Sequence, residues 1–329
     1  MLDDERFSCR GIDIQERIFG PNILLMEGPE HRHYRRIVQA AFGPRELAVL
    51  REYLETEING LLDEEARGES CDLLRLLETY TVRAIGHVCE IEDFERYRDD
   101  AVALAHFHED AERSIQASGA LAAAILPAID RVRERPTNGV LSRIVHGEAD
   151  GAKLTDLEIV SFLRALLPAG TDTTSRWVAI TLLCLLQDPE AMAAVRADCQ
   201  LIRSALEETL RWEPAASIVN RQAMLDVEIG GTTVPAGDLV WLSIGSANRD
   251  PSVFVDPDRW DLHRNATDHL AFSMGTHFCL GFHLAWLEAD VAMRAILSRF
   301  PQMKLDPISN TEIRGLVFRK PESLQIRPG

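Results

Sequence analysis

The sequence predicts a mainly helical fold with small β-sheets, of the α+β class, organised as a single domain over residues 1–329. Helical periodicity dominates residues 30–135, and a long apolar segment follows it. Runs typical of short strands begin only near residue 226. With 46% hydrophobic and 26% charged residues and no linker-like break, the composition is that of a globular chain with one core.

The first half is predicted to consist of amphipathic helices. Apolar residues recur at helical spacing over Arg45–Leu62, Leu73–Val88 and Ala101–Ile115, with short polar breaks between them. Each of these segments can therefore bury one face against the others.

A long helix is predicted to begin after Thr155, which forms a capping-box pattern with Glu158, and to end at Asp188-Pro189. Inside it, Pro168 removes one backbone hydrogen bond, and the following AGTDTT adds hydroxyls that compete for others. We expect a local distortion there. A simple kink and a functional site explain it equally well, because kinks and bulges collect at sites.

The second half of the sequence predicts short strands and irregular segments as well as helices. A helix is predicted over about Ala194–Arg211, followed by strands in DVEIGG, TTVPAG and DLVWLSIG, with Gly230-Gly231 as a hairpin turn. A long irregular stretch then leads to GTHFCLG and a closing helix, FHLAWLEADVAMRAILSRF. Irregular segments of this length in a compact domain are usually functional.

Charge and cysteine usage exclude several function classes. A formal charge of −17 argues against nucleic acid or an anionic membrane as a general partner. Because no uninterrupted apolar run of about 18 residues exists and the first residues are acidic, we expect a cytoplasmic protein. The 6 cysteines lie far apart, without a CxxC pair, so neither a disulfide framework nor a zinc knuckle is indicated.

Cys279 is the cysteine whose surroundings point to chemistry. It lies in FSMGTHFCLGFHLA just before a helix, where unpaired N–H groups favour a thiolate, and Gly275 and Gly281 let a flat partner approach. A thiolate is one of the few proximal ligands of haem iron. Taken alone, Cys279 is better explained as a small buried hydrophobe, the commonest fate of a free cysteine, and the nucleophile of a cysteine hydrolase is a further alternative.

The surrounding motif resembles the haem-binding loop of the cytochrome P450 family. The pattern FxxGxHxCxG is met by Phe272, Gly275, His277, Cys279 and Gly281. Three further motifs of the family precede this loop in the chain, in the order that the family has them. AGTDTT resembles the oxygen-binding groove, with Ala169 and Gly170 as its small residues, EETLR contains the ExxR pair Glu208 and Arg211, and DPDRW supplies Arg259 as third member of that ion network.

The resemblance implies a role for several basic side chains. HRHYR places His31 and Arg35 in an HxxxR arrangement that points at the haem propionates in the family, and Arg221 matches another such position. Residues at i and i+4 share a helix face, and an arginine fork suits a carboxylate. The implied ligand of the iron is Cys279, and the implied cofactor is haem b.

The activity implied is that of a monooxygenase of the bacterial soluble type, which inserts one atom of O2 into a small to medium hydrophobic substrate. Asp172 and Thr173 match the family's acid and alcohol pair for proton delivery and oxygen activation. The implied electron donor is a separate ferredoxin with its NAD(P)H reductase. A membrane anchor and nucleic acid are not expected as partners.

The chain departs from the family pattern in three places. It begins at MLDDERFS, which in the family lies well inside the protein, so the expected fold lacks the N-terminal helix and first strands, leaving the run Leu239–Ile244 with an unpaired edge. The alternative function is therefore a truncated haem-binding remnant without activity. Ser273 replaces a glycine, which we expect to matter little, and Trp286 replaces an arginine near the surface where the donor docks.

Overall fold

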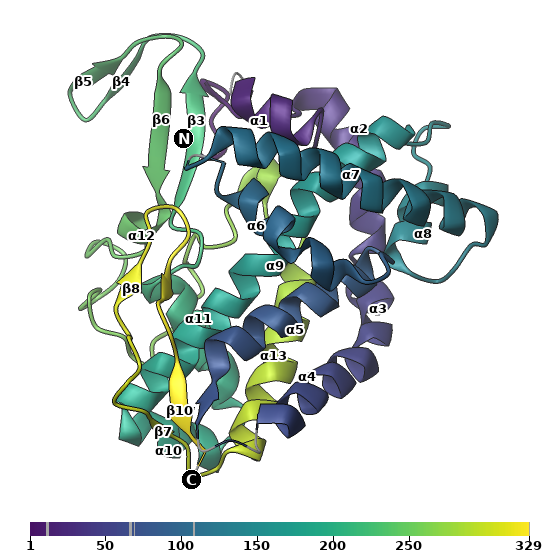
Figure 1. Cartoon of the computed structure of the whole chain (residues 1–329). Coiled ribbons are helices and arrows are strands. Elements are labelled where there is room, and N and C mark those ends of the chain that lie inside the picture. Colours follow the sequence, from purple (N-terminus) through teal and green to yellow (C-terminus); the bar gives the residue numbers. More distant parts are fainter. Residues whose placement is uncertain (11–12, 66–67, 69, 108, 329) are drawn as a thin grey trace.

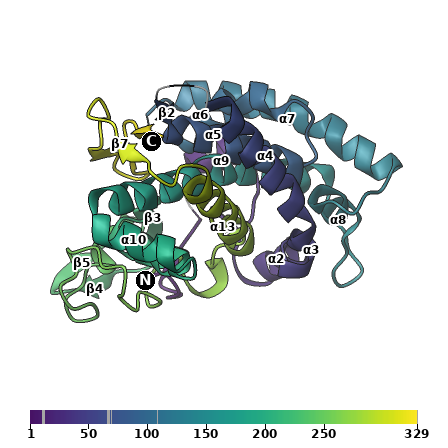
Figure 2. The same ribbon diagram turned by 90° about the horizontal axis from the view of Figure 1, so that it is seen from below.

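The computed structural model describes residues 1–10, 13–65, 68, 70–107 and 109–328. Helices gather on one side and short strands on the other, with the β4–β5 hairpin on the side opposite to α8 in both views (Figures 1 and 2). The helices are α1 (Asp13–Phe19), α2 (Gly28–Ala41), α3 (Pro44–Leu47), α4 (Arg51–Glu65), α5 (Leu73–Val88), α6 (Arg98–Ala105), α7 (Ala111–Glu134), α8 (Val140–His146), α9 (Asp156–Gln187), α10 (Pro189–Ala197), α11 (Leu201–Trp212), α12 (Ile244–Ala247) and α13 (Phe282–Arg299). Three 3-10 turns cover Ala48–Leu50, Phe94–Tyr97 and Gly275–His277. The predicted fold class, mainly helical with small sheets, is confirmed.

Helix α9 forms the centre of the molecule. It packs against α5, α6, α7, α11 and α13 (Figure 1). From Ile159 to Leu185 almost every side chain is buried, on all faces of the helix. A helix that is apolar all round is stable only when other elements cover it, so the helices of both halves of the chain surround this one.

The predicted start and end of α9 are confirmed. The Thr155 hydroxyl accepts from the Glu158 N–H, and the Glu158 carboxylate accepts from the Thr155 N–H at 2.7 Å, which completes the capping box. The helix ends at Gln187, before Asp188 begins α10 as its N-cap.

The helix continues through Pro168 without a break, so the expected distortion does not interrupt it. Hydroxyl groups nevertheless bond to the backbone in this stretch. Thr171 donates to the Leu167 carbonyl at 2.8 Å, and Thr173 donates to the Ala169 carbonyl at 2.7 Å. These side chains contact the same carbonyls that the helical ladder uses, as expected for Thr inside a helix.

The helix predicted over Leu73–Val88 is confirmed in full, whereas three others are divided. The segment Arg45–Leu62 consists of α3, a 3-10 turn and α4, because the tighter turn brings both Leu47 and Leu50 into the core. The prediction over Ala101–Ile115 is wrong at its centre, since the Asp110 side chain accepts from the Arg113 N–H and begins α7.

The helix predicted over Ala194–Arg211 is also two helices. The Asp198 side chain accepts from the Gln200 N–H at 2.9 Å, a local turn that separates α10 from α11. An aspartate that bonds its own backbone competes with helix continuation, and the apolar periodicity on either side concealed this break.

The strands form small antiparallel sheets. The first has the order β1 (Phe7–Ser8), β3 (Ile218–Ala223), β6 (Leu239–Ser243), and the second has the order β2 (Cys71–Asp72), β10 (Gln325–Arg327), β7 (Lys304–Leu305). Two hairpins, β4–β5 (Val227–Ile229, Thr232–Val234) and β8–β9 (Ile313–Arg314, Lys320–Pro321), complete the set among the described residues.

The predicted turn at Gly230-Gly231 joins β4 to β5, and both glycines have positive φ, 57° and 82°, as the tight turn requires. Among the named strands, β6 pairs only with β3, so it has the expected open edge, with Leu239 and Trp241 about half exposed.

In the described part of the chain, α7 is long and apolar enough by composition to cross a bilayer, and α9 with α10 meets the criterion only as a pair bent by 110°. The same criterion is met by core helices of globular proteins, and α7 packs against α6, α8 and α9. Its composition is therefore weak evidence for a membrane span.

Candidate functional site

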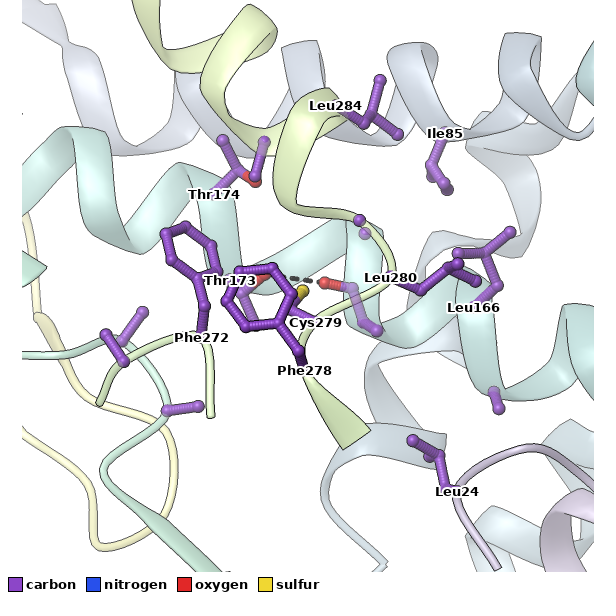
Figure 3. A pocket seen from close by; sticks show the side chains of 18 of the residues that line it. Leu24, Ile85, Leu166, Thr173, Thr174, Phe272, Phe278, Cys279, Leu280 and Leu284 are labelled. Carbon is purple, nitrogen blue, oxygen red and sulfur yellow. Dashed lines mark hydrogen bonds between the residues drawn. The ribbon is translucent and has the colours of Figure 1, made fainter. Parts of the chain in front are cut away.

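An apolar cavity lies between α9 and the segment that leads into α13. Cys279 and Phe278 face it from this segment, and Thr173 and Leu166 face it from α9 (Figure 3). Together with its mouth the cavity holds about 1240 Å³ of empty space. Apolar walls with a few convergent polar groups are typical of a cofactor or substrate site.

The loop around Cys279 is held by its own backbone. The Cys279 N–H donates to the Phe272 carbonyl at 2.8 Å, and the Phe278 N–H donates to the Gly275 carbonyl at 3.1 Å. The loop ends at Gly281, the N-cap of α13. These bonds place the Cys279 sulfur at the beginning of the helix, as the sequence predicted.

Two opposing effects act on the Cys279 thiol. Burial raises its pKa above the ordinary value, and the N–H groups of Gly281 and Phe282 and the charge of Arg35 offset only part of this rise. These same groups would stabilise the anionic sulfur once a metal ion takes the place of the proton. Helix and loop geometry therefore prepare this sulfur to act as a thiolate ligand.

Ser273 adopts a left-handed backbone, with φ of 61°, and Gly275 has φ of 66°. A residue with a Cβ in this region costs about 1–2 kcal/mol relative to the right-handed conformation. The expectation that the serine matters little stays a prediction, and the strain bears on it, because glycine adopts this conformation more readily.

Four basic side chains predicted from separate parts of the sequence lie near one another beside the cavity. Arg35 of α2 and His277 of the loop line it, and His31 of α2 and Arg221 of β3 lie next to His277. The rings of His31 and His277 have centroids 4.6 Å apart. Burial, then the charges of His31, Arg221 and Arg35, lower the pKa of His277 to about 4. The electrostatic cost of this arrangement favours an anionic partner.

In the described structure, Arg35 and Arg221 donate hydrogen bonds only to carbonyl oxygens of the backbone and of the Gln39 side chain. Arg35 donates to the Phe278 carbonyl at 2.6 Å, and Arg221 donates to the Asn220 carbonyl at 2.8 Å. The Nε2 atom of His31 is buried without a hydrogen-bond partner. Because a buried polar atom without a partner costs free energy, this atom indicates a place for a bound acceptor or donor.

On α9, the two residues predicted for catalysis point in different directions. Thr173 is half-buried and lines the cavity, with Ala169 and Gly170 on the same wall. Asp172 is buried outside that lining, where it pairs with Arg176 and lies 3.7 Å from the Nε2 atom of His106. Burial opposes its charge, yet the nearby His106 and the charge of Arg176 lower the pKa of Asp172 to about 2.

Gly170 has a second reason to be small. A Cβ at this position would lie 2.6 Å from the Cδ1 atom of Ile85, so the glycine also permits the close packing of α5 on α9. The sequence indicated only the need for space in the cavity.

The ExxR pair forms the predicted ion pair, fully buried. Arg211 donates to both carboxylate oxygens of Glu208, at 2.7 and 2.8 Å. Its other N–H groups donate to the carbonyls of Asn248, Pro257 and Arg259. The pair thus ties α11 to the irregular segment that precedes the Cys279 loop.

The assignment of the Arg259 side chain to this network is wrong. That side chain is 65% exposed and pairs with Asp256 and Asp261. Arg264 takes the place instead, since its Nε donates to Glu208 at 3.1 Å and its side chain is 11% exposed. Arg259 contributes only its backbone carbonyl, because the turn at 256–259 directs its side chain to solvent.

Glu288 of α13 was not predicted as part of the site. It is buried, lines the cavity, and its Oε1 atom has no hydrogen-bond partner. Burial raises its pKa to about 8, so the folded protein keeps this acid protonated at neutral pH. The sequence carried one signal, since Glu288 stands at i+4 from Leu284 on the apolar face of the closing helix.

Trp286 belongs to an aromatic cluster. Its ring meets the ring of Trp177 edge-on, with centroids 4.9 Å apart, and the Arg203 guanidinium lies 4.5 Å from its centroid. Phe272 contacts the same Trp177 at 5.9 Å. The residue in place of the family's arginine therefore supports the loop by packing.

All six cysteines are unpaired, and among the described residues no group of three or more His, Cys, Asp or Glu side chains could hold a metal ion. An iron bound at Cys279 would thus need its remaining ligands from a non-protein group such as a porphyrin.

The family model of cytochrome P450 matches residues 103–327, which include α9, α11 and the Cys279 loop. The chain belongs to the cytochrome P450 family. Cytochrome P450 107B1 of Saccharopolyspora erythraea is 35% identical over 318 residues, covering 94% of this chain and 78% of the relative. The epothilone C/D epoxidase of Sorangium cellulosum is 35% identical over 313 residues, covering 90% and 74%.

Solved structures of cytochrome P450 proteins share the fold. PksS of the Bacillus subtilis bacillaene polyketide synthase superposes with a TM-score of 0.92 at 30% identity, covering 100% of this chain and 87% of that one. P450BioI, solved in complex with an acyl carrier protein carrying hexadec-9Z-enoic acid, gives a TM-score of 0.89 at 29% identity, covering 99% and 88%. The relatives are named as monooxygenases, epoxidases and oxygenases.

The family implies a haem iron as cofactor, and the residues present fit one. The cavity is apolar, Cys279 faces inward, and Arg35 and His277 line it, with the unpartnered Nε2 of His31 in the ring next to His277. A haem has an apolar macrocycle, an iron that accepts a thiolate, and two carboxylates, so each of its three parts meets a matching surface.

Proposed function

We propose that this P450 is a haem-thiolate monooxygenase that inserts one atom of O2 into a small to medium apolar molecule. The observation that carries the proposal is that the Cys279 thiol and the Thr173 hydroxyl face one apolar cavity with a basic rim. When bound, haem b supplies the activation of O2 with two electrons and two protons, and the protein supplies binding, orientation and proton delivery.

In this proposal Cys279 ligates the iron, and the N–H groups of Gly281 and Phe282 favour its anionic form against the effect of burial. His31, Arg35, Arg221 and His277 bind the propionates, with arginine forks suited to carboxylates. Phe272, Gly275 and Gly281 shape the loop. Ala169 and Gly170 keep the opposite wall open, although Gly170 also serves the packing of α5.

Thr173 acts at the cavity wall. Its hydroxyl donates to the Ala169 carbonyl, which leaves the oxygen lone pairs directed at the cavity as acceptors. Asp172 relays protons to it from the far side of α9, where Arg176 holds the carboxylate ionised. The hydroxyl can therefore both receive and pass on a proton without leaving its position.

The walls around the mouth determine the substrate. Ile23, Leu24, Phe162 and Leu166 contribute apolar surface, and no described wall residue other than Arg35, His277 and Glu288 is ionisable apart from Cys279 itself. An apolar organic molecule is the ligand that gains most from this surface. Relatives named for epothilone epoxidation and polyketide biosynthesis are in keeping with this class.

The electron donor in the proposal is a ferredoxin with its NAD(P)H reductase, in the cytoplasm. A groove beside Trp286 is lined by Arg51, Arg203 and Arg294, and by Asp290, which pairs with Arg51 and Arg294. The excess of cationic side chains there attracts an acidic electron carrier and speeds its encounter.

A carbon monoxide difference spectrum of the reduced, haem-loaded protein tests the proposal. We expect a Soret band at the long-wavelength position of thiolate ligation, which shifts to the short-wavelength position in Cys279→His. Cys199→Ser, at an exposed cysteine, is the matched control and leaves the band unchanged. A protein that takes up haem without the thiolate band supports the remnant without activity, and one that stays colourless with haemin supports the cysteine hydrolase; either result overturns the proposal.

A further inference from the structure

His106 follows α6 directly and lies between two carboxylates on opposite sides of its ring. Its Nδ1 atom is 3.1 Å from the Oε1 atom of Glu109, and its Nε2 atom is 3.7 Å from the Oδ2 atom of Asp172. Neither His106 nor Glu109 belongs to the motifs that resemble the P450 family. The imidazole therefore bridges α9 and the segment after α6 with one nitrogen toward each.

The two carboxylates differ in their access to water. The side chain of Glu109 is 77% exposed, whereas that of Asp172 is 6% exposed, and that of His106 is intermediate at 28%. An imidazole can accept a proton on one ring nitrogen and release another from the second. The ring thus spans the boundary between solvent and the buried acid behind Thr173.

Two cationic side chains also lie near this pair. Arg176 of α9 pairs with Asp172 and lies 3.5 Å from the His106 Nε2 atom. Lys320 of β9 also lowers the pKa of Asp172 and is held by Glu78 of α5. The Phe318 ring closes the remaining side, 6.0 Å from the imidazole.

Asp172 alone is a poor proton reservoir. Its pKa of about 2 leaves it ionised at neutral pH, so any proton that it passes on must come from a neighbour. The interaction with Asp172 raises the pKa of His106, with a smaller contribution from Glu109 and against the effect of burial. The pair therefore carries its proton on the imidazole.

We propose that His106 connects Asp172 to solvent and supplies the protons that the monooxygenase reaction consumes. One proton arrives at Nδ1 from water or Glu109, one leaves Nε2 toward Asp172, and the ring then rotates or exchanges tautomer to reset. Because His106 acts through Asp172, it is a positioning residue. This inference rests on the proposed function but can be tested apart from it.

The first test measures the pairing itself by NMR titration of the histidine ring protons in the haem-loaded protein. We expect the His106 resonance, assigned by its loss in His106→Gln, to titrate above the ordinary histidine value and to fall in Asp172→Asn. The exposed His263, assigned in the same way, is unaffected by Asp172→Asn. An unchanged His106 titration in Asp172→Asn overturns the inference, whether or not the protein is active.

The second test measures NAD(P)H-driven reduction of O2 without added substrate, with a plant-type ferredoxin and its reductase. His106→Phe and His106→Gln should lower the rate several-fold above pH 7, raise the solvent isotope effect, and lose the histidine-dependent part of the pH profile. His263→Gln should keep the rate and the profile, and haem content and the melting temperature check folding.

The outcomes separate the two proposals. A normal pH profile in both His106 variants, in a protein that consumes NAD(P)H, overturns the role of His106 and leaves the monooxygenase assignment in place. No consumption by the unaltered protein, despite full haem loading, counts against the proposed function, and the NMR titration then decides whether His106 and Asp172 share a proton.

Discussion

Replacing Glu288 by glutamine tests whether a protonated acid lies in the core beside the cavity. Glu288 is buried, and its pKa rises from 4.5 to about 8 because burial disfavours the carboxylate. The folded state then binds this proton more tightly than the unfolded state does. Stability from this group is complete below about pH 4.5, falls as the pH rises toward 8, and is constant above that.

The magnitude follows from the size of this shift. One pKa unit corresponds to about 1.4 kcal/mol, so the group lowers the free energy of unfolding by about 1.4 kcal/mol per pH unit across this window, and by about 5 kcal/mol in all. Glutamine has nearly the same shape and no charge, so Glu288→Gln should remove this slope. The difference in stability between variant and unaltered protein should grow in favour of glutamine by about 3 kcal/mol from pH 5.5 to 7.5.

Urea unfolding followed by circular dichroism at pH 5.5, 6.5 and 7.5 measures the slope. Glu64→Gln, at an exposed acid of α4, is the matched control and should leave the dependence on pH unchanged. Parallel stability curves for the unaltered protein and Glu288→Gln would show that the folded protein holds this carboxyl ionised, and would refute the reasoning.

Three further predictions concern the loop, the ion network and the cavity wall. Ser273→Gly should raise the free energy of unfolding by about 0.5–1 kcal/mol, since glycine adopts φ of 61° without strain but loses more entropy on folding; a lower melting temperature would contradict this. Arg264→Ala should cost about 3 kcal/mol and reduce haem retention, because it leaves buried Glu208 short of a cation, whereas Arg259→Ala should cost under about 0.5 kcal/mol; equal losses in denaturant unfolding would return Arg259 to the network. Thr173→Ala should keep the carbon monoxide spectrum but direct electrons several-fold more into hydrogen peroxide, measured per NAD(P)H consumed; unchanged coupling would remove Thr173 from proton delivery.

Features that depend on neighbours in the chain were predictable from the sequence. The bounds of α5, the capping box of α9 and the glycine turn between β4 and β5 match their predictions. Local hydrogen bonds and side-chain periodicity determine each of them. The three divided helices were missed because their breaks depend on which leucines face the core and on two aspartates that bond their own backbone.

In the candidate site, too, some residues could be predicted from the sequence and others could not. Motif spacing alone brought Cys279, Thr173 and the ExxR pair to notice, since they stand in recognisable local patterns. It could not show that Arg264 instead of Arg259 contacts Glu208, because the two differ only in where a long turn directs them. Nor could it show that Glu288 lines the cavity or that His106 faces Asp172, because these positions depend on elements that are far apart in the chain.

The amino-acid sequence by itself therefore determined the family, the cysteine that faces the cavity and the helix on the opposite wall. Each of these depends on a contiguous motif. The tertiary structure decided the protonation of the buried groups, because a pKa depends on burial and on charges brought near by folding. It also decided which arginine completes the ion network and which side of α9 Asp172 occupies, because the packing of α6 and of the segment before the Cys279 loop sets those contacts.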